Sequence, residues 1–246
     1  MQTIIIEHIK RGNVLVWSSI HMLATTPLLW LYAAVLAAVL YGTHALMLTI
    51  PSIYPLIIAL TFAATFCKIF VMAFIIHQVM NLLGGVRPTY SASIQACITR
   101  LWPLAAFAVL ESLVWGICMI SGICVYRAAY VLIATIWYTV TLPVIPLIID
   151  NHRSLYELFQ ATIIIDAKIW IEALIGSLYS TLVLPLLYYV INYALQPQAL
   201  LPMSVGILYL LAALIVVLEA IFKALVYRAA DRSRLEELSE IEAPYF

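Results

Sequence analysis

No Asp, Glu, Lys or Arg side chain occurs anywhere between Arg11 and Lys68. A helix needs about 20 apolar residues to cross the hydrocarbon core of a bilayer, so this run alone has room for two crossings. The whole chain follows the same trend, with 65% hydrophobic and 10% charged residues, against about 45–50% and about 25% in soluble domains. Too few polar side chains remain to cover a water-exposed surface. The sequence therefore predicts an integral membrane protein of the all-α class.

Breaks at proline, glycine and charged residues divide the apolar pattern into six predicted transmembrane helices, which together form a single transmembrane domain over residues 1–246. Their limits are about 27–50, 54–80, 101–120, 129–149, 169–193 and 203–227, and residues 228–246 form a charged tail. Pro143 and Pro146 both fall inside the fourth span. Because proline removes a backbone donor and clashes with the preceding turn, the pair predicts a kink or an unwound turn there.

Three further segments, residues 3–24, 91–101 and 154–166, have an apolar face opposite a polar one. This pattern predicts amphipathic helices that lie in the membrane interface. Each of them precedes two spans, which divides the chain into three similar units, about 3–80, 89–150 and 154–227. Duplication and the shared constraints of membrane hairpins explain this repetition equally well.

The positive charges predict how the chain is oriented. If the N-terminus is cytoplasmic, the only cation of the outer loops is Arg127, and the cytoplasmic segments hold Lys10, Arg11, Arg87, Arg100, Arg153, Lys168, Arg228, Arg232 and Arg234. Lys and Arg concentrate on the cytoplasmic side of membrane proteins. We therefore expect both termini in the cytoplasm.

Small residues recur at every fourth position in the first two predicted spans. Such stripes allow the backbones of neighbouring helices to approach closely, which joins helices in a solvent as apolar as their side chains. We expect them to pack within one chain, with a dimer interface as the alternative. The stripes are Ala34, Ala38 and Gly42 in the first span and Ala59, Ala63 and Cys67 in the second.

Lys68 and Glu111 lie near the middle of the second and third predicted spans. A lone charge at that depth costs about 3 kcal/mol on insertion scales, so the two side chains are expected to pair inside the bundle. The pair has two interpretations. It either fixes the register of two helices, or it couples protons or substrate or binds a polar headgroup.

Other polar groups are assigned structural roles. Glu219 and Lys223 are four residues apart and can pair on one helix face, and Lys223 can extend toward the cytoplasmic edge. Glu172 is expected in the first turn of the fifth span, where the helix dipole favours a carboxylate. We find no spacing typical of catalytic, cofactor-binding, metal-binding or nucleic-acid-binding residues, and therefore assign none.

The segment Trp137-Tyr-Thr-Val-Thr-Leu-Pro143-Val-Ile-Pro146-Leu-Ile-Ile-Asp150 is followed by the amphipathic stretch Ser154–Asp166. This arrangement, with the opening Trp17 and Pro27-Leu-Leu-Trp30, resembles a group of uncharacterised six-span prokaryotic membrane proteins. These are similar to the membrane domain attached to some glycerophosphodiester phosphodiesterases. The resemblance implies the architecture and a prokaryotic inner-membrane location, and it brings no catalytic residues.

These patterns support two classes of function. The first is a non-enzymatic membrane component, such as a scaffold, an assembly factor or a subunit that binds other membrane proteins. The second is a small transporter or lipid-handling protein that uses the kinked fourth span and the Lys68–Glu111 pair. An intramembrane enzyme ranks below both. The lipid bilayer is the one partner that the composition itself predicts.

Overall fold

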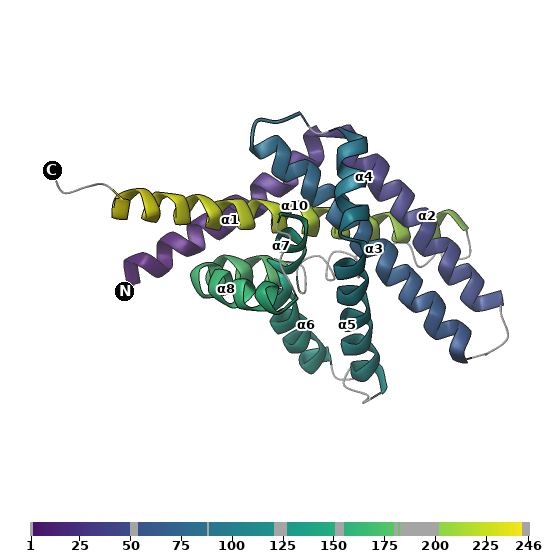
Figure 1. Ribbon diagram of the computed structural model, residues 1–246. Coiled ribbons are helices and arrows are strands. Elements are labelled where there is room, and N and C mark those ends of the chain that lie inside the picture. The colour runs from purple at the N-terminus through teal and green to yellow at the C-terminus, as the bar shows by residue number, and fades with distance from the viewer. Residues whose placement is uncertain are drawn as a thin grey trace.

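The structure is a computed structural model that describes residues 2–49, 54–87, 89–120, 127–150, 155–179, 182 and 202–242. Every regular element within these ranges is a helix (Figure 1). The predicted all-α helical bundle is therefore confirmed.

Five helical segments of the described chain are long and apolar enough to cross a membrane. They belong to α2 (Pro27–Thr49), α3 (Tyr54–Leu83), α5 (Leu101–Ile120), α6 (Arg127–Thr141) together with α7 (Val144–Asp150), and α10 (Pro202–Glu242). Of the predicted fifth span, Ile169–Leu178 is a shorter apolar helix. Most of the rest of that span lies outside the described residues, so five of the six predicted spans are present.

The fourth span is broken where the two prolines predicted a break. The α6 helix ends at Thr141 and α7 begins at Val144, with Pro143 in the turn between them. The ring of Pro143 cannot continue the helix because it lacks an N–H group and clashes with the preceding turn. Pro146 lies in the first turn of α7, where no partner is needed for a backbone N–H. The predicted unwound turn is thus confirmed.

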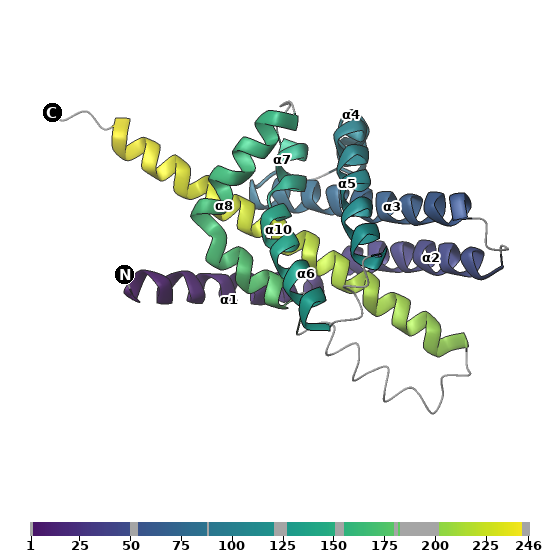
Figure 2. The ribbon, with the colours of Figure 1, turned by 90° about the horizontal axis from the view of Figure 1, so that it is seen from below.

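The segments predicted as amphipathic are all helical where the structure describes them. The first is α1 (Gln2–Thr25), and the second is α4 (Tyr90–Thr99), whose N-terminal cap is Thr89. The third was predicted to end near residue 166, before the next span begins. It instead continues into that span as the single helix α8 (Leu155–Leu178). The charged residues near position 167 do not end a helix that contains no glycine or proline before Gly176. Figure 2 shows that α8 bends along its length.

The longest helix, α10, runs through the centre of the molecule (Figure 1) and packs against α1, α2, α3, α7 and α8. We predicted that it would end near residue 227 and give way to a tail. Its apolar span is Gly206–Ala230, close to the prediction, but the helix continues through the charged segment to Glu242, because no glycine or proline occurs between Gly206 and Pro244. The beginning of α1 and the end of α10 lie on the same side of the molecule (Figure 1).

The predicted small-residue stripes are not where helices meet within the chain. Ala34, Ala38, Ala59 and Ala63 are exposed, and a Cβ placed on Gly42 would have no atom within 4 Å. The expectation that these stripes pack inside one chain is therefore wrong. On α2 the buried small residues are instead Ala33 and Ala37, each one position earlier in the sequence.

Glycine is used for close approach elsewhere, at Gly12 and Gly176. A Cβ on Gly12 would lie 2.7 Å from Ile175 Cδ1, and one on Gly176 would lie 2.0 Å from Phe222 Cε1. No real side chain tolerates such distances without displacing its neighbour. The absence of a side chain therefore lets α8 approach α1 at one position and α10 at the other.

Candidate functional site

The first candidate site is the pair predicted at the middle of the membrane. The structure brings Lys68 on α3 and Glu111 on α5 together, with Lys68 Nζ donating to Glu111 Oε1. Their side chains are 26% and 10% exposed, respectively. Both helices are long apolar segments that pack against each other, so the pair lies where an isolated charge would be costly.

The surroundings of this pair bear on its two interpretations. Three cavities border the described helices, and neither Lys68 nor Glu111 is among the residues that line them. A route for protons or substrate would need polar space beside the pair. The contact itself satisfies both charges and fixes α3 against α5.

A second polar group lies on α10. Lys223 Nζ bonds to Glu219 Oε1 at 2.8 Å and lies 5.1 Å from the centre of the Tyr138 ring on α6. The predicted pairing is thus present. The predicted extension of Lys223 toward the membrane edge is wrong, because its side chain is 4% exposed. The carboxylate and the aromatic ring instead hold the ammonium inside the bundle.

Glu172 has a different partner from the one expected. Because α8 begins at Leu155, Glu172 lies deep within a helix rather than in its first turn, so the predicted role of the helix dipole is wrong. His8 Nδ1 of α1 lies 2.7 Å from Glu172 Oε1, and the Glu172 side chain is 3% exposed. This contact joins the N-terminal helix to α8, close to the crossing at Gly12.

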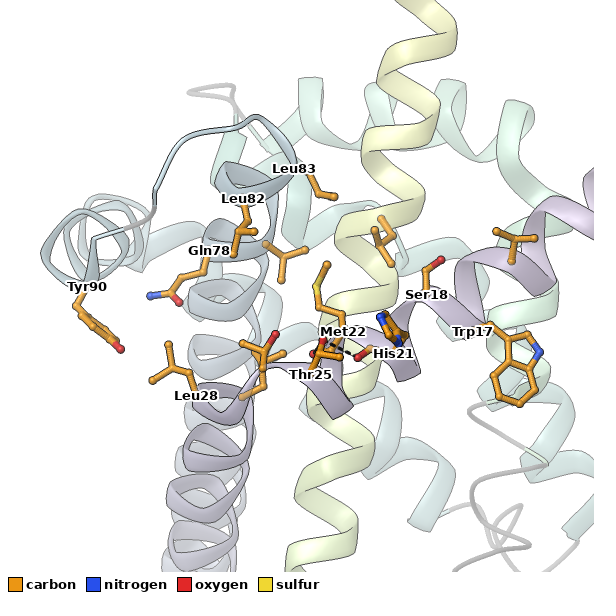
Figure 3. Close-up of a pocket in the computed structure, with 15 residues that line it drawn as sticks. Trp17, Ser18, His21, Met22, Thr25, Leu28, Gln78, Leu82, Leu83 and Tyr90 are labelled. Atoms are coloured by element: carbon orange, nitrogen blue, oxygen red, sulfur yellow. Dashed lines mark hydrogen bonds between the residues drawn. The ribbon is translucent and has the colours of Figure 1, made fainter.

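The second candidate site is a cavity of about 810 Å³ lined by residues of α1, α2, α3, α4 and α10. It lies where α1 and α2 meet at an angle beside the C-terminal end of α3 (Figures 1 and 3). The contributing residues are Val14, Trp17, Ser18, His21, Met22, Thr25 and Thr26 from α1 and the turn after it, Leu28 and Leu29 from α2, Gln78, Val79, Leu82 and Leu83 from α3, Tyr90 from α4, and Leu225 from α10. We call this space the α1–α3 cavity.

Two faces of α1 explain how the α1–α3 cavity forms. Gly12, Val16, Ser19 and Leu23 recur at helical spacing and are buried. This face packs against α8 and α10. The other face, from Val14 to Thr25, is left to line the cavity.

The polar groups of the α1–α3 cavity include no Asp, Glu, Lys or Arg side chain, and they lie at its two ends and between them. Gln78 and Tyr90 are at one end, and Trp17 is at the other, with His21 and Thr25 between them (Figure 3). Gln78 is 6% exposed, and its Oε1 accepts a hydrogen bond from Tyr32 O–H at 3.2 Å. Tyr32 also interacts with Tyr90. A small network of hydroxyl and amide groups thus borders an otherwise apolar space.

The depth of the α1–α3 cavity follows from the ends of the spans that line it. Leu28 and Leu29 belong to the first turn of α2, and Leu82 and Leu83 to the last turn of α3. These two apolar helices pack side by side (Figure 2), so their adjoining ends mark one surface of the bilayer. The cavity therefore lies at a membrane–water boundary.

Sequence reasoning missed the α1–α3 cavity because no single segment encodes it. The spacing of Val14, Trp17, Ser18 and His21 along one helix face was visible in the sequence. The sequence did not reveal which helices this face would meet, because those neighbours depend on the angle between α1 and α2 at Thr26. In the described part of the chain, no group of three or more His, Cys, Asp or Glu side chains is arranged to hold a metal ion.

Comparisons with known proteins identify no relative. No protein-family model, curated protein or solved structure matches this chain. The resemblance based on the Trp137–Asp150 segment therefore stays a prediction. The five apolar helices establish the general conclusion, which is a polytopic membrane protein in a lipid bilayer.

Proposed function

We propose that this protein is a lipid-handling membrane protein that holds an amphiphilic molecule in the α1–α3 cavity. The observation that carries the proposal is the volume and lining of that cavity. Its volume of about 810 Å³ is within the range of about 300–1,000 Å³ that is typical of small-molecule sites. Its lining is mostly apolar, with a few polar side chains gathered at defined places.

The position of the α1–α3 cavity supports an amphiphile rather than a water-soluble ligand. An amphiphile resides at the membrane boundary, with its polar end near water and its chain in hydrocarbon. Trp17 is 65% exposed and Tyr90 is 52% exposed, and both residue types favour this boundary. The distribution of positive charges favours the cytoplasmic side for this cavity. The resemblance of the Trp137–Asp150 segment implies a prokaryotic inner membrane.

Filling the α1–α3 cavity tests this proposal. Ser18→Trp adds a large side chain to the cavity wall. Ala24→Trp adds the same side chain at an exposed position of α1 that does not line the cavity. Native mass spectrometry of the protein released from detergent should detect a bound amphiphile in the wild type and in Ala24→Trp, and not in Ser18→Trp. Equal retention by the two variants would contradict the proposal.

The predicted role as a scaffold or complex subunit is the second candidate. The stripe of exposed Ala34 and Ala38 with half-buried Gly42 favours it, because small residues on an outer face let another helix approach closely. Ala38→Leu should then reduce copurification of a partner or of a second copy in mild detergent. The same copurification from Ala38→Leu as from the wild type would count against this candidate.

The Lys68–Glu111 pair is not part of the proposed binding site, since neither residue lines the α1–α3 cavity. We propose for it the structural role of joining α3 to α5. We also propose that the protein is not an enzyme. That proposal rests on the lack of a recognisable nucleophile–base arrangement in the sequence.

A further inference from the structure

We infer that the α1–α3 cavity selects an amphiphile with an uncharged, hydrogen-bonding headgroup and a single apolar chain, of the monoacylglycerol type. This inference rests on the proposed function and adds the chemical class of the ligand. It depends on three properties of the cavity, which are its charge, the placement of its polar groups and its size.

The lining of the α1–α3 cavity offers a phosphate no cationic Lys or Arg side chain. None of the fifteen described residues that line the α1–α3 cavity is Asp, Glu, Lys or Arg. Moving an ionised group out of water is costly unless an opposite charge pairs with it. A neutral headgroup needs only hydrogen bonds, and these the cavity can supply.

Several cations lie close in sequence to residues that line the α1–α3 cavity, and none of them lines it. Arg228 Nη2 donates to the Met80 carbonyl oxygen at 3.4 Å. Lys10 is exposed one turn before Val14, toward the end that holds Trp17, and Arg87 is exposed in the segment before Tyr90. Because Arg87 is nearest in sequence to the polar end, it is the cation that an anionic headgroup would be expected to use. It is therefore included in the test below.

The polar end of the α1–α3 cavity suits a hydroxyl or ester headgroup. Gln78 has both a donor and an acceptor in one amide, and Tyr90 has a hydroxyl that can do either. Figure 3 shows these two side chains directed toward each other at one end of the cavity. Since Gln78 is nearly buried, a headgroup that reaches it must give up water and accept these neutral partners in return.

The apolar part of the α1–α3 cavity suits one chain. Leu28, Leu29, Val79, Leu82 and Leu225 form an apolar part of its wall. Its volume corresponds to a ligand of ordinary drug size. The ligand chain would run from the Gln78–Tyr90 end toward Trp17, along the face of α1.

Three probes that share one oleoyl chain test this inference. They are monooleoylglycerol, which is neutral, lysophosphatidylcholine, which is zwitterionic, and lysophosphatidylglycerol, which is anionic. Each is added to the purified full chain at about pH 8, where an ordinary imidazole is neutral. Native mass spectrometry then measures how much of each stays bound. We expect monooleoylglycerol to be retained at least about tenfold more than lysophosphatidylglycerol, the ratio that about 1.4 kcal/mol would produce.

Two substitutions should change this selectivity in a defined way. His21→Arg places a cation in the α1–α3 cavity and should shift the preference toward lysophosphatidylglycerol. Ala24→Arg adds the same charge to α1 outside the cavity and should leave the preference unchanged. Arg87→Gln should also leave it unchanged. Elution volume and helicity establish that each variant is folded.

The possible outcomes separate this inference from the proposed function. If the probes bind equally and Ser18→Trp abolishes binding, the cavity binds amphiphiles and the inference about the headgroup is wrong. If lysophosphatidylglycerol binds best and Arg87→Gln removes that binding, the inference is also overturned. If Ser18→Trp leaves every probe bound, the proposed function itself fails. If Ser18→Trp instead dissociates a dimer, the cavity is a protein interface and both proposals fail.

Discussion

The crossing of α1, α8 and α10 and the junction of α3 with α5 are held together in different ways. At the crossing, Gly12 and Gly176 allow helices to approach so closely that a single methyl group would collide with Ile175 or Phe222. At the junction, Lys68 bonds to Glu111 across two long apolar helices. Steric fit thus dominates one region, and a polar contact adds to apolar packing in the other.

This difference shows what small residues in an apolar helix do and do not predict. Ala34, Ala38 and Gly42 have the spacing of a helix-packing stripe, but the two alanines are exposed and a Cβ on Gly42 would meet no atom within 4 Å. Gly176 is part of neither predicted stripe, and it makes the closest approach of the described glycines. Small side chains permit contact, but the angles at which helices leave their connecting turns decide which small residues are used.

The largest effect on stability is expected at the α3–α5 junction. Lys68→Met leaves Glu111 largely buried without its cation, and breaking such a pair costs about 3–5 kcal/mol. Because Lys68 is 26% exposed, we expect the lower end, about 3 kcal/mol. The free energy of unfolding in detergent micelles, measured with a denaturant, gives this value.

Replacing both partners separates the effect of the pair from the effect of packing. The double variant Lys68→Met with Glu111→Met removes both charges, and an apolar pair of similar volume is often as stable as an ion pair. We expect the double variant to be more stable than Lys68→Met alone. A double variant that is less stable than the single one would mean that the charge is not what holds this junction.

The next largest effect is expected at the crossing. In Gly176→Ala the new methyl group would lie 2.0 Å from Phe222 Cε1, and the Phe222 side chain is buried at 4% exposure. Overpacking of this kind costs about 1–3 kcal/mol. Thermal unfolding followed by circular dichroism should therefore show a lower midpoint for Gly176→Ala.

Gly42→Ala is the matched control in the other region, on α2. Its methyl group would meet no atom within 4 Å. Alanine is favoured over glycine in a helix interior by up to about 1 kcal/mol, so the midpoint should stay the same or rise. Equal loss of stability in the two variants would remove the proposed difference between the two regions.

The sequence predicted the elements of this fold better than their contacts. The proline break at Pro143 and the pairing of Lys68 with Glu111 were predictable, since proline acts locally and a lone intramembrane charge needs a partner. The contact of His8 with Glu172 was not, because it joins residues far apart in the sequence through the path of a bent helix. The α1–α3 cavity was not predictable for the same reason.

The contact between His8 and Glu172 should contribute less to stability than the Gly176 crossing. His8→Ala removes the imidazole that contacts Oε1 of the buried Glu172 carboxylate. We expect this loss to lower the free energy of unfolding by about 1–2 kcal/mol. We expect faster hydrogen exchange in α1, because this helix loses its polar link to α8. A double-mutant cycle with Glu172→Gln should give a coupling energy of at least about 0.5 kcal/mol. Additive single effects would show that the two side chains do not interact.

The last and smallest effect concerns the reactivity of a single thiol, that of Cys97. This residue lies on α4, where that helix packs against α3. Cys97 is 0% exposed, and burial raises the pKa of its thiol to about 12. Since the thiolate is the reactive form, Cys97 should react with maleimide at about pH 8 only after denaturation. The matched control is Ile98→Cys in a background without the other cysteines, because Ile98 is the next residue of α4 and is 58% exposed. Equal labelling rates at the two positions in the folded protein would mean that α4 does not bury one face against α3.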